Sequence, residues 1–105
     1  MEKILKYPIV AREDGDFWII FIPDFYKRFG GMTQVEDARE IRKMAADYIK
    51  LAVEELIESG EEIPKPSTFE NLDMSEYEEF KFDNSVDYRM YVGIDLPEVQ
   101  YAGSL

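Results

Sequence analysis

The chain has 105 residues, the length of a single domain, and carries a formal net charge of −11. It contains no cysteine and no histidine, which excludes disulfides, zinc sites built on thiolate or imidazole, and Ser-His-Asp or Cys-His catalysis. We predict neither a cofactor nor a bound metal.

The first third of the chain predicts three strands. Lys3–Arg12 and Phe17–Ile22 are rich in apolar and β-branched residues and flank the turn cluster Glu13–Asp16, which is typical of a β-hairpin. A glycine pair, Gly30-Gly31, then leads into a short third strand at Met32–Gln34. These segments predict an antiparallel meander.

A long helix is predicted over Ala38–Ser59. Asp37 and Glu40 have the spacing of a capping box, and Gly60 can adopt the left-handed conformation that ends a helix. Apolar residues between these caps recur at spacings of three and four, which predicts one apolar face. They are Ile41, Met44, Ala45, Tyr48, Ile49, Ala52 and Leu56.

The prolines of Ile63–Ser67 require an extended chain after the helix. Residues 61–86 form an acidic connection without clear periodicity. Asp87–Leu96 alternates between apolar and polar side chains, which predicts a fourth strand, and Pro97–Leu105 form a tail.

The order βββαβ predicts one two-layer α+β domain over residues 1–105, with one long helix on a small sheet. A strand that returns after a crossover helix tends to lie parallel to its neighbour in the same sheet. We therefore expect a parallel fourth strand.

Six short sequence words follow one another between residues 4 and 67. They are Tyr7-Pro8-Ile9-Val10, Glu13-Asp14-Gly15, Phe17-Trp18, Phe21-Ile22-Pro23-Asp24-Phe25, Thr33-Gln34 and Gly60-Glu61-Glu62-Ile63-Pro64-Lys65-Pro66-Ser67. In their order and spacing, the chain resembles the HicB-like antitoxin family.

This resemblance implies a partial RNase H-like fold and the role of the acidic antitoxin in a type II toxin–antitoxin pair. The partner in that family is HicA, a small basic toxin with a double-stranded-RNA-binding-like fold that cleaves mRNA and uses a histidine. The antitoxin domain covers the toxin's active face. The resemblance thus implies a HicA-like toxin as the partner of this chain.

The sequence departs from the family pattern in two places. Tyr26–Met32 replaces a shorter turn. Most members also carry a C-terminal helix-turn-helix or ribbon-helix-helix segment that binds the operon's promoter, whereas only Pro97–Leu105 follow the predicted fourth strand here. Because the acidic surface also repels phosphate, we expect no direct nucleic-acid binding by this chain.

Acidic side chains concentrate toward the C-terminus: residues 1–60 carry 9 basic and 12 acidic side chains, whereas residues 61–105 carry 3 and 11. Five glutamates lie around the predicted helix end, where the helix dipole is already negative, and three cations lie near its positive start. Because these charges interact unfavourably with the helix dipole and bring no local gain, we interpret them as a docking surface for a cationic toxin. The alternative is that they form only a solvated face. The candidate toxin-binding residues are Glu54, Glu55, Glu58, Glu61 and Glu62, and the cations are Arg39, Arg42 and Lys43.

The open face of the predicted sheet favours a homodimer, because one helix covers only one face. We assign its interface to Trp18, Ile20 and Ile22, with Trp18 lying partly in the core. Lys27 and Arg28, beside two aromatic residues, are interpreted as part of a solvated loop rather than an RNA-binding patch.

We predict that the protein is not an enzyme and assign no catalytic residue. A two-metal nuclease needs carboxylates that converge from strand interiors, and Ile4–Val10 contains none. No uncharged run approaches the ~20 residues of a membrane span, and no apolar signal sequence follows Met1. We expect a soluble cytoplasmic antitoxin without membrane contact; the alternative is a stand-alone oligomerising or small-ligand-binding module.

Overall fold

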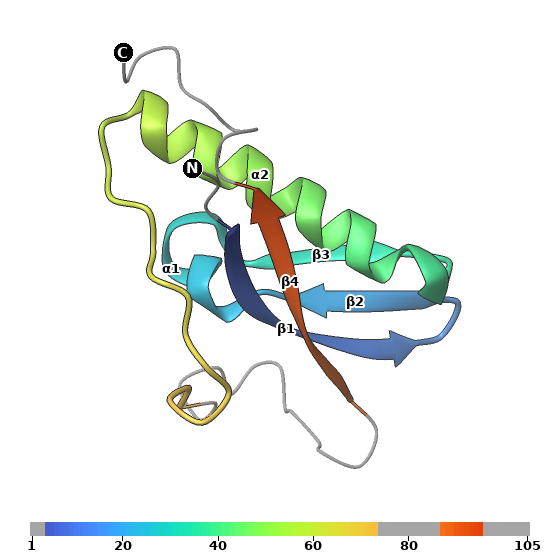
Figure 1. Cartoon of the computed structure of the whole chain (residues 1–105). Coiled ribbons are helices and arrows are strands. Elements are labelled where there is room, and N and C mark those ends of the chain that lie inside the picture. Colours follow the sequence, from blue (N-terminus) through green and yellow to red (C-terminus); the bar gives the residue numbers. More distant parts are fainter. Residues whose placement is uncertain (1–3, 74–86, 96–105) are drawn as a thin grey trace.

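The computed structural model describes residues 4–73 and 87–95. Within them, a four-stranded antiparallel sheet lies under one long helix, which confirms the predicted two-layer α+β fold (Figure 1). The predicted tail Pro97–Leu105, Leu96 at the end of the predicted fourth strand and residues 74–86 of the acidic connection lie outside the described residues.

The predicted meander is confirmed. β1 (Ile4–Asp14) and β2 (Phe17–Phe21) form an antiparallel hairpin around a turn in which Gly15 has a φ of +64°. β3 (Met32–Val35) pairs with β2 on the other side. β4 (Tyr88–Asp95) pairs with β1, so the strand order is β3-β2-β1-β4.

The fourth strand runs antiparallel to β1, so the expectation of a parallel returning strand was wrong. The rule for crossover connections applies when the chain passes from the helix directly back into the sheet. Here the chain leaves the helix and residues 61–73 run back along the side of the sheet (Figure 1). β4 therefore enters from the end of the sheet at which β1 finishes.

The long helix begins as the 3-10 turn η2 (Ala38–Glu40) and continues as α2 (Ile41–Glu58). The predicted cap is present, because the Asp37 Oδ1 accepts a hydrogen bond from the Arg39 backbone N–H at 2.8 Å. The Arg39 guanidinium also binds this carboxylate and lowers its pKa.

At the other end of α2, Gly60 adopts a φ of +71°. Its N–H donates to the Ile57 carbonyl, and the Glu61 N–H donates to the Leu56 carbonyl. These two bonds form a Schellman motif, as the glycine predicted.

The core lies between α2 and the facing side of the sheet. Alternate residues of the strands, such as Tyr7, Ile9 and Ile20, are fully buried against Ile49 and Val53 of the helix. Burial of each such side chain stabilises the fold by roughly 1.5–3 kcal/mol.

The predicted homodimer residues do not form an exposed surface. Ile20 and Ile22 are 0% exposed and belong to the core beneath α2, so they cannot contact a second copy. Trp18 is half-buried against the same core and stacks on Tyr88 with ring centroids 5.3 Å apart. The assignment failed because Phe17–Ile22 is apolar on both faces and therefore has no alternation to read.

The stretch predicted as a solvated loop is exposed in part but regularly folded. It consists of the 3-10 turn η1 (Pro23–Phe25) and the short helix α1 (Tyr26–Phe29). Gly31 follows with a φ of +60°, where a Cβ would lie 2.5 Å from the Ile22 carbonyl oxygen. The Tyr48 hydroxyl holds this return by donating to the Phe29 carbonyl and accepting from the Gly31 N–H, each at 3.0 Å.

Candidate functional site

The structure places all five predicted toxin-binding glutamates in exposed positions at one end of the helix layer. Glu54, Glu55 and Glu58 lie in the last turns of α2, and Glu61 and Glu62 follow it. Glu61 forms an ion pair with Arg28 of α1 at 3.2 Å. We call these five residues the helix-end cluster.

The three cations near the start of α2 have local partners. Arg39 pairs with Asp37 at 2.8 Å, and Lys43 pairs with Asp47 at 2.9 Å across one helical turn. Arg42 donates to the backbone carbonyl of β4 at Tyr91. The interpretation that these charges bring no local gain was therefore wrong at this end of the helix.

Side-chain hydrogen bonds fix the extended segment after the helix, residues 61–67, which we call the strap. The Tyr7 hydroxyl donates to the Pro64 carbonyl at 2.7 Å. The Asp24 carboxylate accepts from both the backbone N–H and the hydroxyl of Ser67, at 2.8 and 2.6 Å. Burial raises the pKa of the Tyr7 phenol, and the nearby charge of Asp24 raises it further.

Three of the words that carry the family resemblance meet at this place: the first contains Tyr7, the fourth contains Asp24 and the last contains Pro64 and Ser67. Phe25 packs edge-on against the Tyr7 ring with centroids 4.9 Å apart. The strap thereby positions Glu61 and Glu62, whereas the other three residues of the helix-end cluster are positioned by α2.

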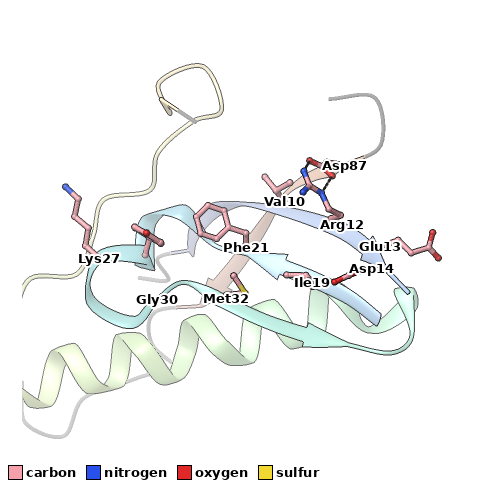
Figure 2. Close-up of a pocket in the computed structure, with 11 residues that line it drawn as sticks. Val10, Arg12, Glu13, Asp14, Ile19, Phe21, Lys27, Gly30, Met32 and Asp87 are labelled. Carbon is pink, nitrogen blue, oxygen red and sulfur yellow. Dashed lines mark hydrogen bonds and ion pairs between the residues drawn. The ribbon is translucent and has the colours of Figure 1, made fainter. Parts of the chain in front are cut away.

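A groove of about 1100 Å³ lies on the face of the sheet opposite α2 (Figure 2). Its floor is apolar and consists of Val10, Ile19, Phe21 and Met32 from the three strands β1, β2 and β3. Val10 and Phe21 are buried, whereas Met32 is 45% exposed. The Tyr26 ring, which packs edge-on against Phe21, contributes to one wall.

Strand register places these floor residues side by side. Val10 lies opposite Phe21, and Phe21 lies opposite Met32. Because side chains of paired residues point to the same face of an antiparallel sheet, all three point away from α2. Alternate residues of the same strands therefore form the core on one face of the sheet and the floor of the groove on the other.

The two ends of the groove carry opposite charges. Lys27 of α1 lies at one end, and Glu13 and Asp14 of β1 lie at the other (Figure 2). All three side chains are exposed. The arrangement offers an apolar middle with a cation on one side and two carboxylates on the other.

A bidentate ion pair lies on the rim of the groove. Arg12 binds both carboxylate oxygens of Asp87, each at 2.7 Å, and the Asp87 residue is only 9% exposed. The pair ties the residue before β4 to the middle of the sheet. Sequence reasoning missed it because the two residues are 75 positions apart, and the only signal was their place at the ends of two apolar strands.

The described residues contain no group of three or more His, Cys, Asp or Glu side chains arranged to hold a metal ion. None of the helices in the described ranges is long and apolar enough to cross a membrane. The two surfaces are suited to binding. One is the exposed acidic helix-end cluster, and the other is the apolar groove with charged ends.

The fold is similar to that of a solved chain from a toxin–antitoxin complex of Streptococcus pneumoniae. The similarity has a TM-score of 0.72 at 23% sequence identity and covers 98% of this chain and 77% of the other. No protein-family model matches the sequence, and no curated protein matches it either. The comparison therefore establishes the fold.

Proposed function

We propose that this protein is a cytoplasmic, non-enzymatic antitoxin that binds and neutralises a protein toxin. The observation that carries the proposal is the likeness of nearly the whole chain to a chain of a toxin–antitoxin complex. The resemblance of residues 4–67 to HicB-like antitoxins, which the six sequence words carry, supports the same proposal.

The proposed partner is a small basic HicA-like toxin that cleaves mRNA. A net charge of −11 favours a basic partner, because opposite charges speed encounter and select against acidic partners. The helix-end cluster supplies exposed carboxylates for this encounter. Within residues 4–73 and 87–95, only Glu61 of the cluster forms an ion pair, so a toxin could bind the other four carboxylates without breaking an existing interaction.

The first test is co-expression with the product of the adjacent reading frame. We expect that product to be small and basic, to arrest growth when expressed alone and to co-purify with this chain in a stoichiometric complex. An adjacent product that neither arrests growth nor binds would contradict the proposal.

The second test addresses the helix-end cluster. Reversal of Glu54, Glu58 and Glu62 to Lys should slow association with the toxin and weaken its salt dependence, since complementary charge acts mainly on the association rate. The matched control reverses Glu36, Glu40 and Glu70, which are also exposed but lie near the start of α2 or beyond the strap. Equal association rates for the two variants would show that only net charge matters.

The groove favours a second candidate function, a stand-alone oligomerising or small-ligand-binding module. Its volume of about 1100 Å³ is just above the range of roughly 300–1,000 Å³ that is usual for ligand sites. This candidate predicts a homodimer or a ligand complex without a toxin partner. Light scattering of the purified chain, with and without the adjacent gene product, separates the two functions.

A further inference from the structure

The groove has the composition of the centre of a protein interface. Such centres are apolar, poor in charge and surrounded by a polar rim. Here Ile19 and Met32 are accessible on the floor of the groove, and the charged residues lie at its ends and on its rim. Phe17, which register places on the same face, is 40% exposed and extends the apolar area toward the hairpin.

The helix-end cluster lacks such a centre. The large apolar side chain exposed on the described part of α2 is Leu51, which is 68% exposed and precedes Glu54 and Glu55 by one turn. Exposed charges of this kind mostly affect association rates, whereas buried apolar contacts hold a complex together. The contact that determines how long a partner stays bound is therefore expected elsewhere.

The shape and charge of the molecule indicate what fills the groove. A second copy would bring another charge of −11 and would place one concave face against another, which leaves the hollow unfilled. A protruding apolar side chain fills a hollow of this kind. Glu13 and Asp14 at one end favour a cationic neighbour, and among the described residues neither carboxylate takes part in an ion pair.

We propose that the groove is the anchoring site for the basic protein partner: an apolar side chain of that partner occupies the hollow over Ile19 and Met32, and an adjacent Lys or Arg binds Glu13 or Asp14. This inference rests on the proposed function and adds to it that the two surfaces have different roles in binding. The helix-end cluster attracts the partner, and the groove retains it.

The test uses two charge-neutral variants of the full chain. Met32→Gln places a polar amide in the groove, and Leu51→Gln makes the same kind of change at an exposed apolar residue of the opposite layer. Because Met32 is 45% and Leu51 68% exposed in the free protein, thermal melts of the two variants should stay close to the wild type. Dissociation rates from the purified adjacent gene product are then measured at fixed salt.

We expect Met32→Gln to speed dissociation about tenfold and Leu51→Gln to leave it within about twofold. A third variant, Glu13→Gln with Asp14→Asn, should speed dissociation by less than tenfold. Combined with Met32→Gln it should add little, because the carboxylates lie next to the anchor. Ile19→Thr gives an independent variant of the floor that keeps a β-branched residue in the strand.

Three outcomes overturn the inference. Unchanged dissociation of both Met32→Gln and Ile19→Thr from a toxin that binds the wild type would place the anchor outside the groove and leave the proposed function intact. Conversion of a wild-type dimer into a monomer by these variants, with toxin binding unchanged, would assign the groove to a second copy. Absence of any wild-type complex with the adjacent product would remove the proposed function and this inference together.

Discussion

The two faces of the sheet differ in how deeply their apolar side chains are buried. Ile20 points toward α2 and is fully buried, whereas its neighbour Ile19 points into the groove and remains partly accessible. The covered face therefore contributes most of the folding stability, because residues such as Tyr7, Ile9 and Ile20 are closely packed beneath α2. The open face buries Val10 and Phe21 but leaves Ile19 and Met32 accessible beside them, and a contiguous accessible apolar patch of this kind marks a binding surface.

Neighbouring truncations on β2 should show the largest difference between the faces. Ile20→Ala removes fully buried methyl groups and should lower the free energy of unfolding by about 4 kcal/mol. Ile19→Ala should lower it by about 1 kcal/mol, because its side chain already contacts solvent. Urea denaturation of both variants measures the difference. Similar losses in the free energy of unfolding would mean that Ile19 is packed as closely on the open face as Ile20 is beneath α2.

Removal of the half-buried ion pair between Arg12 and Asp87 tests whether the open face also contributes to stability. Arg12→Ala leaves the Asp87 carboxylate in a buried position without its bidentate partner and should destabilise the fold by about 3 kcal/mol. Lys43→Ala, which removes an exposed pair on α2, should leave the unfolding midpoint nearly unchanged. If the two variants melt alike, the pair on the groove rim is not a structural tie.

The two glycines that end α1 both have a positive φ but differ in the space available for a Cβ atom. Gly31→Ala forces a Cβ against the Ile22 carbonyl as well as a left-handed conformation, and it should destabilise the fold by about 3 kcal/mol. Gly30→Ala has the same conformational strain but open space around the new methyl group, and should lose about 1 kcal/mol. Equal losses would show that the return toward β3 shifts easily.

The smallest effect is expected at the strap. Tyr7→Phe removes the hydrogen bond to Pro64 and should lower the free energy of unfolding by about 1 kcal/mol at neutral pH. The folded-state pKa of Tyr7 is raised, so its neutral form is favoured by folding and the wild type should lose stability as the pH rises above about 10. Tyr7→Phe should lose less over that alkaline range, measured by melting temperature against pH. A parallel decline in both proteins would assign the alkaline loss to other groups.

Local signals in the sequence predicted the elements well, because caps and turns depend on nearby residues. Asp37 and Gly60 were located at the two ends of the helix, and the hairpin turn was located at Gly15. The two-layer α+β architecture followed from the order of these elements.

What could not be predicted depends on contacts between distant segments. Phe17–Ile22 is apolar throughout, so its sequence does not indicate which of its residues face the core. The packing of α2 over Ile20 determines this. The direction of β4 depended on the path of the strap along the sheet. The groove could not be predicted because its floor consists of residues from three strands whose register is set by pairing.

The place of β1 in the sheet has a consequence for the order in which the chain folds. Its partner β2 follows within a few residues, whereas its other partner pairs Ile4 with Asp95 across almost the whole chain. Closing so long a loop is entropically unfavourable, and contacts of high sequence separation form late. β4 is therefore expected to join a sheet that is already assembled. The ion pair between Arg12 and Asp87 then forms after the folding transition state, so its contribution should appear in the rate of unfolding rather than in the rate of folding.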